Sequence, residues 1–109
     1  MHPVTKGSLS PERQRLLQLM QNLNFGRIDG LAVRGGEPQF EPAPRVVRQI
    51  KFGGENGPRG ERGAVDFALK AEVVELFGHF DRLRDGMVET LEVQRGLPFR
   101  MSVAEVVRA

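Results

Sequence analysis

The sequence aligns with itself when it is shifted by 60 residues, and this internal repeat restricts the possible fold more than any other feature. Residues 13–40 match residues 73–100 without a gap, and seven of the 28 pairs are identical. The identical pairs are Leu16/Leu76, Leu23/Leu83, Gly26/Gly86, Leu31/Leu91, Val33/Val93, Gly36/Gly96 and Pro38/Pro98. Shared glycine and proline positions favour a duplicated unit over the alternative, a coincidence between two amphipathic segments.

The first copy has the pattern of a helix followed by strands. Ser10 can cap a helix, Pro11 suits its first position, and Gly26 is available for a left-handed cap at its end. Apolar residues at helical spacing give this helix one buried face: Leu16, Leu17, Met20 and Leu23. Alternating apolar residues and turn glycines then predict three strands, at residues 27–33, 38–41 and 45–52.

The second copy repeats this order. We expect its helix to begin near Asp66 and its strands to span residues 87–93 and 97–101. Ser102 is a candidate cap for a final short helical turn at residues 103–108.

One helix and one hairpin cannot bury enough apolar surface to be stable alone, whereas two such units can share a core. The sequence therefore predicts an α+β fold: a two-layer sandwich in which duplicated helix–strand–strand units form one antiparallel sheet with both helices on one face. Residues 1–9 are expected to be a flexible leader before a single domain over residues 10–109. That domain consists of two repeats, 10–52 and 64–109, joined by a Gly/Arg-rich loop, 53–63.

The segment from Leu23 to Pro38 resembles the core of the short, uncharacterised YezD-like bacterial proteins. The most specific part is the step Phe25-Gly26-x-Ile28, and the resemblance covers residues 13–52. It implies a helix, a strand, a turn glycine and a return strand in a protein of bacterial type, and it implies no activity. The second copy departs from the pattern because Asp85 stands in place of the phenylalanine.

Groups for catalysis or metal binding are scarce. The absence of cysteine excludes disulfides, zinc–thiolate sites, iron–sulfur clusters and cysteine nucleophiles. Glu75 and His79 could supply two metal ligands from one helix turn, but no third ligand follows at helical spacing. Asp29 and Glu89 match in the repeat, and they either form a carboxylate pair or lie exposed beside arginines. We therefore assign no catalytic residue, no metal and no cofactor, and expect a protein that is not an enzyme.

Charge is unevenly distributed along the chain. Residues 1–63 contain ten basic and six acidic side chains, whereas residues 64–109 contain six basic and eight acidic ones. A basic strip lies at residues 45–62, a candidate surface for phosphate or for a protein partner: Arg45, Arg48, Lys51, Arg59 and Arg62. Its glycine-rich part serves either as a linker or as a binding loop.

These features favour a non-enzymatic protein-interaction or adaptor domain that self-associates, as a homodimer, or binds another protein. The alternative is a nucleic-acid-binding protein that uses the basic strip 45–62, although the strip has a single aromatic residue, Phe52. No apolar stretch approaches the length of about 20 residues that spans a bilayer, and no signal core is present at the start. We expect a cytoplasmic protein with no membrane partner.

Overall fold

The computed structural model describes residues 6–53 and 70–105. Within these residues the chain forms an α+β fold, as the sequence predicts, with two α-helices and a five-stranded antiparallel sheet. The elements are η1 (Lys6–Ser8), α1 (Pro11–Leu23), β1 (Gly26–Arg34), β2 (Glu37–Gln39), β3 (Arg45–Arg48), α2 (Ala71–Leu83), β4 (Gly86–Gln94) and β5 (Leu97–Ala104). The bounds of α2 and β4 lie 60 residues after those of α1 and β1, so the repeat in sequence is also a repeat in secondary structure.

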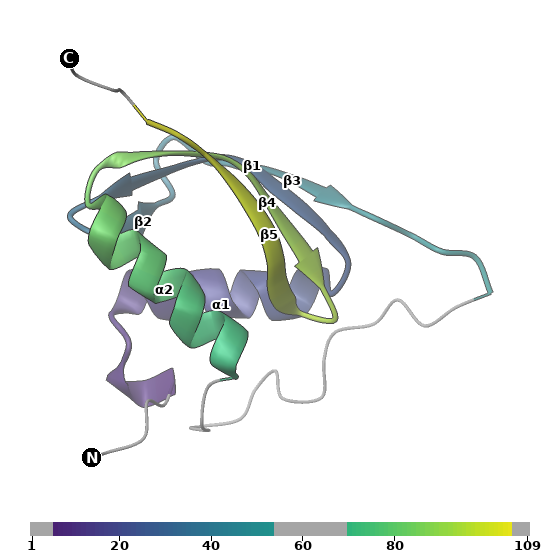
Figure 1. Ribbon diagram of the computed structural model, residues 1–109. Helices are drawn as coiled ribbons and strands as arrows, with labels where there is room; N and C mark the ends of the chain where they lie inside the picture. Colours follow the sequence, from purple (N-terminus) through teal and green to yellow (C-terminus); the bar gives the residue numbers. More distant parts are fainter. Residues whose placement is uncertain (1–5, 54–69, 106–109) are drawn as a thin grey trace.

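The sheet has the strand order β2-β1-β4-β5, and β3 also pairs with β1. Both helices lie on the same side of the sheet (Figure 1). In the central pairing, Ile28 lies opposite Leu91 and Leu31 lies opposite Val88. A shift of 60 residues exchanges these two pairs, so β1 and β4 are related by an approximate twofold axis.

The core lies between the helices and the sheet. Among the described residues, fourteen buried hydrophobic side chains form one cluster, with seven from each unit. The first unit supplies Leu16, Leu17, Met20, Leu23, Ile28, Leu31 and Val33, and the second supplies Val73, Leu76, Phe77, Phe80, Val88, Leu91 and Val93. Neither unit has a separate core, and burial of this apolar surface stabilises both together.

Each helix ends in a γ-turn that reaches the other unit. Asn24 and Arg84 both have φ of 62°, and the carbonyl of the residue before each accepts a hydrogen bond of 2.7 Å from the amide of the residue after it. The Asn24 carbonyl then accepts from the Gly96 amide, and the Arg84 carbonyl accepts from the Gly36 amide, both at 2.9 Å. The helix end of one unit is thereby tied to the hairpin turn of the other.

The prediction of a final helical turn at residues 103–108 is wrong for the part of that segment that the structure describes. Strand β5 continues through Ala104, with Ser102 opposite Thr90 and Val103 opposite Val88. Val103 packs against the core from this position, so strand pairing and burial outweigh the local capping preference of Ser102.

Other boundaries differ by a few residues. Strand β3 ends at Arg48, and beyond it Ile50 and Phe52 are 59% and 93% exposed. In the predicted leader, residues 6–8 form a short 3₁₀ helix, and Leu9 packs against the core. The expected helix start near Asp66 and nearly all of the loop 53–63 lie outside the described residues.

Candidate interaction site

The structure places part of the predicted basic strip along one edge of the sheet. Arg45 and Arg48 are exposed at the two ends of β3, and Lys51 is exposed shortly after it. Arg59 and Arg62 lie outside the described residues. Within the described part of the chain, the strip therefore consists of three cations on a short edge segment.

Arg48 has a structural partner. Its Nη1 atom donates hydrogen bonds of 3.0 Å to the carbonyl oxygens of Asn22 and Leu23, the last residues of α1. A positive charge at this end of α1 also interacts favourably with the negative end of the helix dipole. Arg48 therefore fixes β3 to the end of α1, a role that the sequence pattern did not reveal.

Asp29 lies at the centre of the β1–β4 pairing, opposite Thr90. Its Oδ1 atom accepts a 2.7 Å hydrogen bond from the Thr90 hydroxyl, and its Oδ2 atom accepts one of 3.0 Å from Arg27 Nε. The Thr90 hydrogen bond lowers the pKa of Asp29, Arg27 and Arg45 lower it further, and partial burial opposes them. Of the two interpretations of Asp29, the structure supports the one with arginine partners.

Glu75 and His79 are exposed on α2, and His79 Nδ1 is 3.2 Å from Arg82 Nη2. Among the described residues, no group of three His, Asp or Glu side chains is placed to hold a metal ion.

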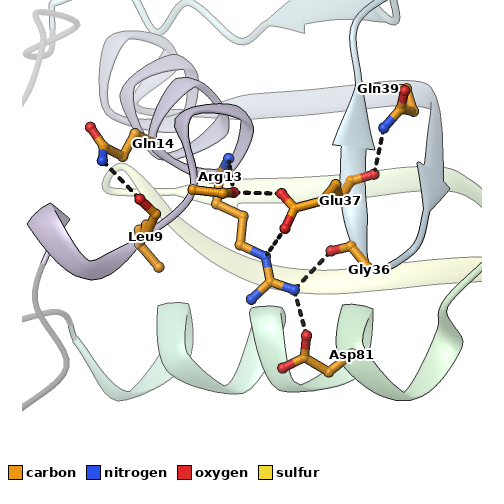
Figure 2. A network of polar contacts seen from close by, with 8 residues as sticks. Leu9, Arg13, Gln14, Gly36, Glu37, Gln39 and Asp81 are labelled. Atoms are coloured by element: carbon orange, nitrogen blue, oxygen red, sulfur yellow. Dashed lines mark hydrogen bonds and ion pairs between the residues drawn. The ribbon is translucent and has the colours of Figure 1, made fainter.

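A polar cluster joins the two units on the helix side of the sheet (Figure 2). Arg13 of α1 donates to the Gly36 carbonyl at 2.8 Å and to Asp81 of α2, and its guanidinium also lies 5.1 Å from the centre of the Phe77 ring. Glu37 lies 3.6 Å from Arg13 Nε and accepts from the Ser10 hydroxyl, which in turn accepts from the Arg13 amide. The cluster holds α1, the first hairpin and α2 together, so we interpret it as structural.

A groove of about 510 Å³ opens between α2 and β5. Its apolar lining residues are Leu76, Leu83, Leu91, Pro98, Phe99, Met101 and Val103. Charged and polar side chains also line it: Glu72, Glu75, His79, Arg82, Arg100 and Glu105. Phe99 is 53% exposed although it is a large aromatic residue, and its ring lies 5.1 Å from the guanidinium carbon of Arg100. The groove therefore combines an apolar floor with charges of both signs around it.

The first unit differs at the matching place. There Phe40 packs against the core, and the guanidinium carbon of Arg15 lies 4.4 Å from the centre of its ring. The residues of the second unit that match Arg15 and Leu19 are Glu75 and His79, and both line the groove. The place of a partly buried aromatic side chain in the first unit thus corresponds to an open groove in the second.

The sequence carried a signal for this groove that was missed. In the repeat, apolar Leu19 and Phe40 match polar His79 and Arg100, whereas polar Gln39 matches Phe99. Exchanges of this kind mark positions where one copy is covered and the other is not.

Comparisons with family models, curated proteins and solved structures find no match to this chain. The YezD-like resemblance over residues 13–52 therefore stays a prediction. No helix in the part of the chain that the structure describes is long and apolar enough to cross a membrane.

Proposed function

We propose that this protein is a non-enzymatic interaction or adaptor domain that binds a protein partner in the groove between α2 and β5. The observation that carries the proposal is the groove itself, with the half-exposed ring of Phe99 beside an apolar floor. Aromatic side chains are enriched at protein interfaces because they bury a large area with few rotatable bonds.

The position of β5 supports the same proposal. It is the last strand in the sheet order, and it is eight residues long. An edge strand of this length offers backbone donors and acceptors to a partner unless it is protected. The groove and the edge of β5 together form one continuous docking surface.

Nucleic-acid binding through the basic strip is the second candidate, supported by the exposure of Arg45, Arg48 and Lys51 near one sheet edge. Because Arg48 also donates hydrogen bonds to the end of α1, Arg45 and Lys51 are the better positions at which to test nucleic-acid binding. Strongly salt-dependent binding that Arg45→Glu and Lys51→Glu abolish would support this candidate.

Site-specific photo-crosslinking in the source cell tests the interaction proposal. A photoreactive amino acid at His79, on the groove, is compared with the same amino acid at Arg34, which is exposed on β1 and does not line the groove. We expect a discrete protein adduct from position 79 and none from position 34. Equal crosslinking at both positions, or none at position 79, would contradict the proposal.

A further inference from the structure

We propose that the partner in the groove is a second copy of this chain, and that two copies exchange Phe99 side chains, each Phe99 entering the groove of the other copy. In the same contact Arg100 of one copy faces the acidic Glu72 and Glu75 of the other. This inference rests on the proposed function, because it names the occupant of the same groove.

The first unit shows what fills such a position. Phe40 lies against the face of α1 that corresponds to the groove side of α2, beneath the guanidinium of Arg15. The fold thus has a place for an aromatic ring accompanied by a cation. In the second unit Arg100 stands at the position that matches Phe40, and Glu75 stands at the position that matches Arg15. An aromatic side chain at the Phe40 position, together with a positive charge that balances Glu75, would reproduce the arrangement of the first unit.

The chain itself displays this combination on its surface. Phe99 and Arg100 are adjacent on β5, and the side chain of Arg100 is 65% exposed. Arg100 also pairs with Glu92 at 3.1 Å, an exposed ion pair that contributes little and does not prevent a second carboxylate from approaching. Because the guanidinium carbon of Arg100 lies 5.1 Å from the centre of the Phe99 ring, an aromatic ring and a guanidinium are presented together, as Phe40 and Arg15 are in the first unit.

The place of Phe99 makes the exchange reciprocal. Phe99 lines the groove that it would fill in a second copy, so a twofold axis near Phe99 brings each ring to the other groove. Because β5 ends the sheet order, two copies can approach along this edge. The groove also carries charges of both signs: the acidic residues Glu72, Glu75 and Glu105 and the basic residues Arg82 and Arg100. Such a surface is complementary to itself, and it is a poor match for a uniformly charged partner such as nucleic acid.

Sedimentation of the full chain tests the pairing. We expect the wild-type protein to dimerise within the range of about 1 to 200 µM, in which a homodimer of moderate affinity dissociates. Phe99→Ala is expected to weaken the dimer about 30-fold or more, because each dimer loses two buried rings. Phe52→Ala is the matched control, since Phe52 is 93% exposed and does not line the groove, and it is expected to leave the dimer unchanged. Circular dichroism confirms that both variants are folded.

Charge reversal tests how the two copies are oriented in the dimer. Glu75→Arg and Arg100→Glu are each expected to weaken the dimer, and the double variant is expected to restore it, because the ion pair re-forms with its charges exchanged. Single variants that weaken the dimer without recovery in the double variant would overturn this orientation.

Two outcomes overturn the self-pairing as a whole: a wild-type protein that stays monomeric over the full concentration range, or a Phe99→Ala protein that dimerises like the wild type. A monomer that still crosslinks from position 79 to another protein would leave the proposed function intact and refute only its identification with a second copy. A monomer without any such crosslink would refute both.

Discussion

Gly26 and Gly86 hold the same place in the two units, yet their surroundings differ. A Cβ atom at Gly26 would lie 2.1 Å from the carbonyl oxygen of Val47, which belongs to the backbone of β3. At Gly86 the nearest atom would be Leu83 Cδ1 at 2.8 Å, the end of a flexible side chain. The same substitution therefore has two different consequences.

We predict that Gly26→Ala lowers the free energy of unfolding by about 3 kcal/mol, because β3 must move away from β1. Gly86→Ala is its matched control, and we expect it to cost about 1 kcal/mol, since Leu83 can change rotamer. Urea denaturation of both variants measures the difference. Equal losses would show that β3 does not approach Gly26 as closely as described.

The sequence identified Gly26 as important for an incomplete reason. The repeat of glycine at positions 26 and 86 predicted a left-handed helix cap. In the structure the residues with φ of 62° at the helix ends are Asn24 and Arg84. Gly26 itself has φ of 155°, which disfavours a side chain, and β3 passes close to it, a long-range approach that leaves no trace in the local pattern.

At the scale of elements, Asp29 and Thr90 join β1 to β4 near the twofold axis. The pKa of Asp29 is lowered in the folded state, chiefly by the Thr90 hydrogen bond, so the folded state favours the ionised carboxylate. Its stabilisation is complete above the pKa of the unfolded chain, near 3.8, and is lost as the pH falls through the lower folded value.

We predict that Thr90→Val raises the pKa of Asp29 towards its ordinary value and lowers the free energy of unfolding at neutral pH by about 1 kcal/mol. The free energy of unfolding of the Thr90→Val variant should therefore fall less than that of the wild type as the pH drops below about 4. NMR titration of the Asp29 carboxyl group measures the pKa. Ser102→Ala, on β5 opposite Thr90, is the control and should leave that pKa unchanged.

Arg13 connects three elements, and its side chain is only 14% exposed. We predict that Arg13→Met lowers the free energy of unfolding by about 2 kcal/mol, because the Gly36 carbonyl and Glu37 lose their charged partner. Asp81→Asn should cost less than about 0.5 kcal/mol, since the Asp81 side chain is 65% exposed. A chemical denaturation series compares the two, and a larger effect at Asp81 would contradict the central role of Arg13.

The elements themselves were largely predictable, and the groove was not. Periodic apolar residues indicated both helices and the central strands, since one face of each is buried. The end of β5 was missed because Ser102 has a strong local preference for capping, whereas its strand position depends on pairing with Thr90. In the first unit Phe40 packs beneath Arg15 at the matching place, and the spacing of apolar residues alone does not show that this place is open in the second unit.

At the scale of the whole molecule, the two units share one hydrophobic core. Each supplies half of the fourteen buried hydrophobic residues, and the β1–β4 pairing lies between them. The bonds from Gly36 to Arg84 and from Gly96 to Asn24 cross the same boundary. The repeat in sequence predicts that each unit depends on the other for its stability, because one helix and one hairpin are too small to fold alone. The same argument predicts that damage in one unit spreads to the other.

Leu16 of α1 is fully buried in the first unit and provides the test. We predict that Leu16→Ala lowers the free energy of unfolding by about 3 kcal/mol through the lost burial and the cavity that remains. Because the core is shared, amides of Leu91 and Val93 in β4 should lose as much hydrogen-exchange protection as the amide of Ile28 in β1. If β4 and α2 kept their protection while β1 and α1 lost theirs, the two units would be separate folding units, and the repeat would describe two small domains in contact rather than one.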